Sequence, residues 1–84
     1  PNLTMNIGKR SRYRVRLIHR NVPGVMARVN SIFASSEANV DAQILATMDE
    51  VGYVLTDISA GLGREALEEL SHLPETVRLI ATPL

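Results

Sequence analysis

The chain has 84 residues, 45% of them apolar, and its nine basic and nine acidic side chains give a formal net charge of zero. A chain of this size can bury one small core, so we expect a single folded domain. It has no cysteine, which excludes disulfides and thiolate metal sites, and it has neither an apolar run of about 20 residues nor a signal-peptide pattern. We therefore expect a cytoplasmic protein.

The first ten residues differ from the rest of the chain. The sequence begins with Pro1 rather than Met, and apolar residues alternate only weakly, at Leu3, Met5 and Ile7. We interpret the chain as a piece of a longer protein. Residues 1–10 are expected to be a linker or an edge segment from a preceding domain, and residues 11–84 the folded domain.

A strand is predicted over residues 11–18. Polar and apolar residues alternate there with period two, which is typical of a strand with one buried face. One face carries Arg12, Arg14 and Arg16, and the other carries Tyr13, Val15, Leu17 and His19. The arginine face is expected to be exposed.

A helix is predicted over residues 24–36, because apolar residues recur on one helical face at Val25, Met26, Val29, Ile32 and Phe33. The turn before it has the sequence His19-Arg20-Asn21-Val22-Pro23-Gly24. The first N–H groups of a helix are unpaired and lie at the positive end of its dipole, so such a turn favours a carboxylate. His19 and Asn21 add hydrogen-bonding side chains beside it.

We expect a small anionic or zwitterionic ligand at this turn. The residues alone also allow a structural role, in which Asn21 caps the helix and His19 is a satisfied surface residue. Asn39, which follows the helix, is similarly compatible with a helix end in a left-handed backbone conformation.

The remaining elements complete a strand-helix-strand-strand-helix-strand order. Strands are predicted over residues 40–47, 53–59 and 77–82, a hairpin turn over 48–52, and a second helix over 64–72 with a stripe of Ala66, Leu67, Leu70 and Leu73. This order predicts the α+β ferredoxin-like sandwich, with two helices on one face of a four-stranded antiparallel sheet. Because the core is small, we expect the domain to dimerise through a sheet edge.

Catalytic chemistry has little support in this sequence. No metal-binding, nucleophile-elbow, phosphate-loop or dinucleotide motif is present. His72 precedes Leu73 and Pro74 at a predicted helix end, where a basic side chain complements the helix dipole. We expect no catalytic site, no metal site and no cofactor within the domain.

Charge is distributed unevenly along the chain. Residues 1–28 hold seven basic side chains and no acidic one, whereas residues 29–84 hold all nine acidic ones. This asymmetry indicates either complementary faces within one domain or a nucleic-acid site. Sheet-based RNA readers stack bases on aromatic side chains, and the strands offer only Tyr13, expected on the core side, and Tyr53. We therefore favour the interpretation that the arginines keep an open sheet face soluble or meet a neighbouring domain.

Several blocks of the sequence resemble the ACT domains that end bacterial D-3-phosphoglycerate dehydrogenases. The most specific part is the H-x-N-x-P-G element at residues 19–24, which lies within a matching block at residues 17–25. Other matching blocks lie at 32–34, 38–40, 52–54 and 57–58. The resemblance covers residues 12–82. It implies an allosteric domain that binds L-serine between two ACT domains and feedback-inhibits serine biosynthesis, with NAD bound in a catalytic part absent from this chain.

The resemblance also implies the ligand-binding residues. They are the side chains of His19, Asn21 and Asn39, together with backbone groups of Val25 and Val40. A helix of about 13 residues, rising 1.5 Å per residue, separates His19 and Asn21 from Asn39 by roughly 20 Å. One amino acid cannot span that distance, so a shared ligand requires Asn39 from a second subunit of a two-fold dimer.

Three other functions remain open at this point. The domain can be an ACT domain that senses a different amino acid in another metabolic enzyme or regulator. It can be an RNA-binding module on the same scaffold, for which the basic segment from Lys9 to Arg20 is the support. It can also be a dimerisation module that binds no small molecule.

Overall fold

The computed structural model describes residues 12–60 and 62–84. The predicted linker at residues 1–10 and the first residue of the first predicted strand lie outside the described residues. The elements in chain order are β1 (Arg12–Arg20), α2 (Val25–Ser35), β2 (Asn39–Met48), β3 (Val51–Ser59), α3 (Arg64–His72) and β4 (Thr76–Pro83). Each predicted strand and helix is present, with bounds within about two residues of those expected from periodicity.

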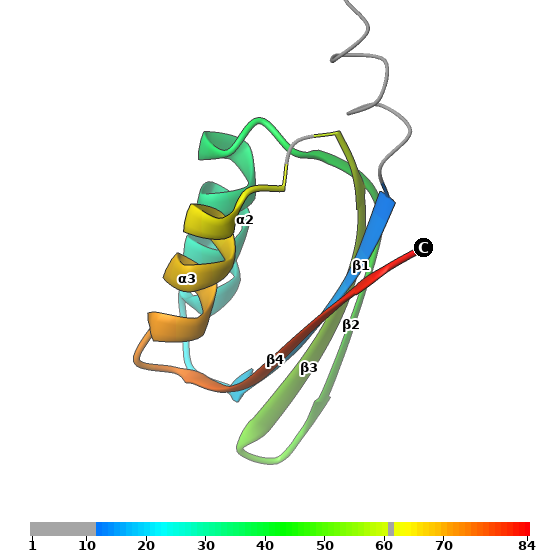
Figure 1. The fold of residues 1–84 in the computed structure, drawn as a ribbon. Coiled ribbons are helices and arrows are strands. Elements are labelled where there is room, and N and C mark those ends of the chain that lie inside the picture. The colour runs from blue at the N-terminus through cyan, green and yellow to red at the C-terminus, as the bar shows by residue number, and fades with distance from the viewer. Residues whose placement is uncertain (1–11, 61) are drawn as a thin grey trace, which may run out of the picture.

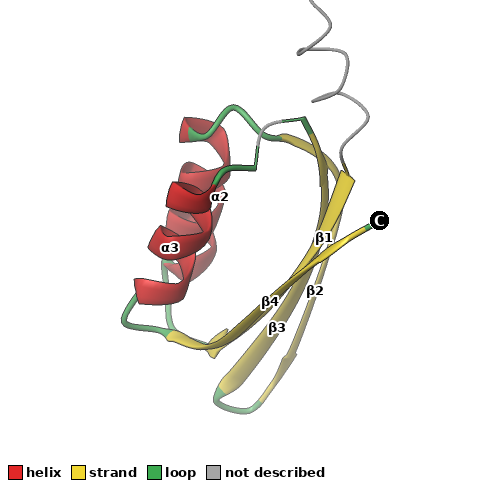
Figure 2. Ribbon diagram, viewed as in Figure 1, coloured by secondary structure: helices red, strands yellow, loops and turns green. Residues whose placement is uncertain are grey.

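The four strands form one antiparallel sheet in the order β2-β3-β1-β4. Both helices pack on the same face of this sheet and leave the other face open (Figures 1 and 2). The arrangement is the predicted ferredoxin-like sandwich. In the register, His19 on β1 lies opposite Gly52 on β3, and Gly52 lies opposite Thr47 on β2.

The core lies between the sheet and the helices. The period-two pattern of the central strands and the 3.6 period of the helices bring their apolar faces together, as predicted. The buried apolar side chains are Val15, Leu17, Val25, Val29, Phe33, Val54, Ile58, Ala66 and Leu70. Each large one contributes roughly 1.5–3 kcal/mol before the loss of conformational entropy is subtracted.

Asn39 does not adopt the left-handed conformation considered for it. Glu37, two residues earlier, has a φ of 63° and makes the turn between α2 and β2. Asn39 is instead the first residue of β2. Its side chain is thereby set at the corner of the sheet, where β2 begins.

The β2 strand lies at an edge of the sheet, and all of its residues are exposed. Its large apolar side chains are Val40, Ile44, Leu45 and Met48, which are 42%, 63%, 49% and 77% exposed. Such an edge presents unpaired backbone groups and apolar side chains together.

Candidate functional site

His19 is the most unusual side chain of the turn between β1 and α2. It is 1% exposed, on the helix-covered face of the sheet, so it is not the surface residue that one reading of the sequence allowed. Its Nδ1 lies 2.9 Å from the carbonyl oxygen of Arg20. Its Nε2 is buried and has no hydrogen-bond partner among the described residues. A buried polar atom without a partner is rare and commonly marks a functional group.

Gly52 makes the position of His19 possible. A Cβ atom added at Gly52 would lie 2.2 Å from Cε1 of His19 and 2.6 Å from its Nε2. The imidazole therefore rests directly on the β3 backbone, in space that any side chain at position 52 would occupy.

Asn21 is exposed and does not cap the helix that follows it. Its Nδ2 donates to the carbonyl oxygen of Asp49 at 3.2 Å, and its backbone N–H donates to the carbonyl oxygen of Glu50 at 2.8 Å. These bonds hold the turn against the β2–β3 hairpin. Gly24, with a φ of 85°, occupies the N-cap position of α2, and no described side chain caps the helix.

The start of α2 therefore retains capacity for an anion. The Val25 N–H lies 3.4 Å from the carbonyl oxygen of Val22, near the long limit for a hydrogen bond. The guanidinium of Arg28 also lies here, since its Nη1 is 3.4 Å from the position of a Cβ on Gly24. The helix dipole gives the turn a positive potential, whereas the charge of Arg28 is balanced by the carboxylate of Glu75.

Arg28 also joins α2 to the turn before β4. Its Nη2 lies 2.5 Å from Oε2 of Glu75, while the backbone N–H of Arg20 donates to the carbonyl oxygen of Glu75 at 2.8 Å. The hydrogen bond from Arg28 lowers the pKa of the Glu75 carboxyl, against the opposing effect of desolvation. The end of the sheet that holds His19 is thus braced by β1, α2 and the α3–β4 turn.

Asn39 lies at the opposite end of the sheet. Its Nδ2 donates to Oδ1 of Asp41 at 2.6 Å and lies 3.4 Å from Oγ of Ser59. Its Oδ1 accepts no hydrogen bond from the described residues, so Asn39 offers a free acceptor. Val40, whose backbone the resemblance also implicates, follows it in the exposed edge strand.

Asp41 is a residue that the sequence reasoning missed. It orients Asn39 and adds negative charge to this corner, and its Oδ2 lies 4.0 Å from Nη2 of Arg12. The two-residue spacing from Asn39 was the available signal, because alternate residues of a strand share a face. The irregular register between Val40 and Ala42 made the contact itself unpredictable.

The structure brings His19 and Asn21 together and separates both from Asn39. Asn39 is paired across the sheet with Ser59, whereas His19 is aligned through Gly52 with Thr47 at the other end of β2. Eight residues at about 3.3 Å each place Thr47 roughly 25 Å from Asn39. One small ligand cannot contact both groups within a single chain.

The basic residues of the open sheet face are partly neutralised within the domain. Arg14 forms two hydrogen bonds to Asp57, at 2.8 and 2.9 Å, and these lower the pKa of the Asp57 carboxyl. With Arg12–Asp41 and Arg28–Glu75, three ion pairs join the basic first third of the chain to later acidic residues. Basic residues of β1 and α2 are therefore paired with acidic residues within the described part of the chain. Tyr13 packs against the core, as predicted.

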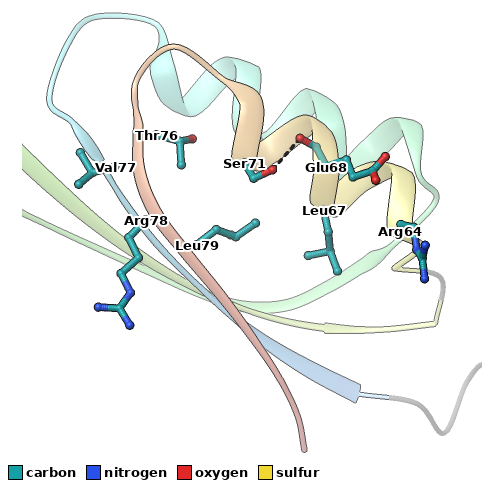
Figure 3. Close-up of a pocket in the computed structure, with 8 residues that line it drawn as sticks. All are labelled: Arg64, Leu67, Glu68, Ser71, Thr76, Val77, Arg78 and Leu79. Atoms are coloured by element: carbon teal, nitrogen blue, oxygen red, sulfur yellow. Dashed lines mark hydrogen bonds between the residues drawn. The ribbon is translucent and has the colours of Figure 1, made fainter.

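A concave region lies between α3 and β4, away from the His19 turn. It is a groove of about 360 Å³ lined by Arg64, Leu67, Glu68, Ser71, Thr76, Val77, Arg78 and Leu79 (Figure 3). The Ser71 hydroxyl donates to the carbonyl oxygen of Glu68, and that of Thr76 donates to Leu70. Because these hydroxyls already serve the backbone, the groove is a weaker candidate than the His19 turn.

His72 has the role expected of it at the end of α3. It lies in the last turn of α3, and its Nδ1 is 2.7 Å from the carbonyl oxygen of Glu68, one turn earlier in the helix. Within residues 12–60 and 62–84, no group of three or more potential ligand side chains is placed to hold a metal ion. Neither described helix has the length and apolarity needed to cross a membrane.

Comparison with known proteins places this geometry in a family. The family model described as "AHAS small subunit-like ACT domain" matches residues 15–78. D-3-phosphoglycerate dehydrogenase from Dictyostelium discoideum is 37% identical over 81% of this chain, and the enzyme of the same name from Escherichia coli K12 is 41% identical over 73%. The chain spans only 16% and 15% of these relatives.

Solved structures with the same fold agree. The ACT domain of GTP pyrophosphokinase from Chlorobium tepidum matches 83% of this chain and 95% of its own length, with a TM-score of 0.69 at 11% identity. Aspartokinase III of Escherichia coli, solved in complex with lysine and aspartate, matches 88% of this chain and 17% of its own, with a TM-score of 0.58 at 24% identity. The chain therefore belongs to the ACT domain family.

Proposed function

We propose that this chain is the effector-binding domain of a D-3-phosphoglycerate dehydrogenase, and that L-serine bound between two copies of it feedback-inhibits the enzyme. The similarity to curated dehydrogenases over most of the chain supports the identity of the enzyme. The catalytic part, where NAD would bind, belongs to the remainder of such a protein. The role of this domain is regulatory.

The observation that carries the two-copy site is the separation of its residues. His19 and Asn21 lie at one end of the sheet and Asn39 lies at the other, roughly 25 Å apart. Each end by itself offers half of a site for an amino acid. A ligand that uses all three side chains must lie between two chains.

The exposed β2 edge supports a way to bring the two halves together. If two copies pair their β2 strands antiparallel about a two-fold axis, the start of one strand lies beside the end of the other. Asn39 of one copy then approaches the end of the sheet that holds His19 and Asn21 of its partner. Symmetry creates two equivalent sites, with backbone groups of Val25 and Val40 at their margins.

The charges at the two ends favour one orientation of the ligand. The carboxylate is attracted to the uncapped start of α2, where the helix dipole supplies positive potential. The ammonium group is attracted to the Asn39 carbonyl, beside the carboxylate of Asp41. A ligand bound in this way bridges the two copies and stabilises their pairing, and it inhibits the enzyme to the extent that the inhibited state binds it more tightly.

An ACT domain that senses another amino acid is the second candidate. It is favoured by the description of the matching family model, which names the AHAS small subunit rather than a dehydrogenase. The three polar side chains recognise the ammonium and carboxylate groups that all amino acids share. Selectivity for one amino acid would then depend on how its side chain fits between the two copies.

Calorimetric titration of the chain with L-serine, glycine, L-alanine and L-threonine distinguishes these functions. We expect saturable binding of L-serine, close to one ligand per chain, and weaker binding of the other three. Equal or tighter binding of another amino acid would favour the second candidate. Absence of binding by all of them would contradict the proposal.

Substitution of Asn39 tests the site itself. Asn39→Ala should weaken L-serine binding at least tenfold without lowering the melting temperature, because the side chain is exposed and bonds only to Asp41 and Ser59. Ser71→Ala is the matched control, since it also removes an exposed hydrogen-bonding side chain but lies on α3. Unchanged binding by Asn39→Ala would exclude Asn39 from the site.

A further inference from the structure

We propose that the open face of the sheet, opposite the helices, is a docking surface for an acidic protein surface with an apolar centre, carried by the catalytic part of the proposed enzyme. This inference rests on the proposed function, because that catalytic part is not contained in this chain. It adds a second binding surface to the domain, separate from the effector site.

The strand register gathers apolar side chains at the centre of the open face, which the helices leave uncovered (Figures 1 and 2). Residues directly opposite each other in neighbouring strands have side chains on the same face of a sheet. Arg16 on β1 lies opposite Leu55 on β3 and Ile80 on β4. Leu55 in turn lies opposite Ile44 on β2, and Ile44 and Ile80 are 63% and 39% exposed. The adjacent row consists of Ala46, Tyr53, Ile18 and Arg78.

Positive charge accompanies this apolar centre. The guanidinium of Arg14 is paired with Asp57 on the same face. The two arginines of the central rows, Arg16 and Arg78, have no carboxylate within 4.0 Å among the described residues. The centre of the face therefore has an excess of positive charge, which is complementary to carboxylates on a partner.

These properties favour a protein surface as the occupant. Stacking of two copies through this face would bring positive charges together, so the charges oppose it. Nucleic acid would satisfy the charges, but sheet-based RNA readers stack bases on aromatic side chains, and the central rows contain Tyr53 among aliphatic residues. An apolar centre with carboxylates around it is a counterpart that a protein surface can supply.

The size of the face indicates that the paired form docks. Four strands about 4.8 Å apart, each with about eight residues at about 3.3 Å per residue, give an area of roughly 500 Å². A stable interface commonly buries about 800 Å² on each partner. Two copies joined along β2 present a continuous face of roughly 1,000 Å², which is sufficient. A ligand that stabilises the pairing therefore also stabilises docking.

Photo-crosslinking in the complete enzyme identifies what lies against this face. Ile80→p-benzoylphenylalanine places a photoreactive group beside Arg16, and mass spectrometry identifies the peptides that it captures. We expect cross-links to acidic and apolar segments of the catalytic part. The matched control is Ser71→p-benzoylphenylalanine on α3, which is also exposed and should give at least tenfold fewer of these cross-links.

Charge reversal tests whether the arginines hold the partner. Arg16→Glu combined with Arg78→Glu should lower the yield of these cross-links at least fivefold. Arg78→Glu alone should lower it by a smaller factor, and it keeps the test usable if the double variant does not fold, because Arg78 is exposed on an edge strand. Arg64→Glu is the control, since it reverses an exposed arginine at the start of α3 and should leave the yield unchanged. Equal yields in Arg78→Glu and Arg64→Glu would contradict the role of the charges and overturn the inference.

The outcome for docking is separable from the outcome for the effector. Cross-links from position 80 to residues 12–84 of another copy, to RNA that copurifies with the enzyme, or to nothing would each overturn the inference. If the chain binds L-serine and these cross-links to the catalytic part are absent, docking is wrong and the proposed function stands. If the cross-links form and the chain does not bind L-serine, docking is supported and the proposed effector is wrong.

Discussion

The imidazole ring of His19 fills the space beside Gly52 that a side chain at position 52 would need. The ring lies where a Cβ of residue 52 would be, and it is buried, so it has little freedom to move aside. The choice of residue at position 52 is therefore limited by the His19 ring as well as by the β3 backbone. This constraint acts between β1 and β3, so the local sequence of neither strand shows it.

Gly52→Ala should lower the free energy of unfolding by roughly 1–3 kcal/mol, the usual cost of overpacking a core. Thermal or denaturant unfolding measures the loss. The control is Gly63→Ser, because no atom lies within 4 Å of an added Cβ there and serine suits the N-cap of α3. It should leave stability unchanged or slightly higher.

A double variant identifies the histidine ring as the cause of that loss. His19→Ala empties the space into which the new methyl group points. Gly52→Ala should therefore destabilise the His19→Ala background by much less than it destabilises the wild type. Equal losses in the two backgrounds would mean that the backbone of β3, rather than His19, rejects the side chain.

At the residue scale the sequence predicted a candidate site, but not the contacts that its side chains make. The spacing of His19, Asn21, Pro23 and Gly24 between a period-two and a 3.6-period segment pointed to the turn. The alternation of the first strand put His19 on the face opposite the arginines, but its contact with Gly52 was not predictable, because Gly52 lies far along the chain. The Asp41 contact to Asn39 was missed for a similar reason, since it depends on an irregular register.

Periodicity was sufficient for the elements themselves. The alternation of β1 and the stripes of α2 and α3 predicted which side chains face the core, because those elements each have one covered face. The sequence pattern of β2 did not predict that both faces of this strand are exposed. Exposure of an edge strand is decided by strand order, which the local pattern does not contain.

Two cross-element ion pairs should make the fold sensitive to acid. Arg14 lowers the pKa of Asp57 between β1 and β3, and Arg28 lowers that of Glu75 between α2 and the α3–β4 turn. A carboxyl with a lowered pKa in the folded state stabilises that state above its unfolded pKa and loses this effect as the pH falls. The loss should begin near the ordinary values of 4.5 for Glu75 and 3.8 for Asp57.

Denaturant unfolding between about pH 6 and pH 3 measures this loss. Asp57→Asn and Glu75→Gln should each flatten part of the acid-side decline, and Arg14→Gln should act like Asp57→Asn because it removes the same hydrogen bonds. A decline that is as steep in Asp57→Asn as in the wild type would assign the acid sensitivity to other groups.

We predict that the domain dimerises through its β2 edge. Ile44 is 63% exposed near the middle of β2, so in an antiparallel β2–β2 pairing its two copies lie close to the two-fold axis. Ile44→Lys replaces an apolar contact by two like charges and should weaken the dimer about tenfold or more. Sedimentation equilibrium over a range of concentrations measures the change.

The opposite edge of the sheet supplies a matched control. Val77 on β4 is 62% exposed, almost the same as Ile44, and Val77→Lys should leave the dimer intact. A wild-type protein that is monomeric at all concentrations would contradict the pairing, and so would a dimer broken by Val77→Lys but not by Ile44→Lys.

The residues proposed to bind the ligand lie at the two opposite ends of the molecule. One end holds His19, the open start of α2 and Arg28, and the other holds Asn39 and Asp41. Two antiparallel copies place unlike ends together, which suits a zwitterionic ligand at each junction. The central claim is that each site takes Asn21 from one chain and Asn39 from the other.

Complementation between two defective variants tests that claim most directly. Asn21→Ala and Asn39→Ala change exposed side chains, so both variants should fold and dimerise, and each alone should bind L-serine poorly. After subunit exchange in an equal mixture, half of the dimers are mixed, and each has one intact site and one doubly damaged site. Calorimetry should then recover high-affinity L-serine binding at about a quarter of the wild-type number of sites. No recovery, with subunit exchange verified, would mean that Asn21 and Asn39 act within one chain or not at all, and would contradict the account.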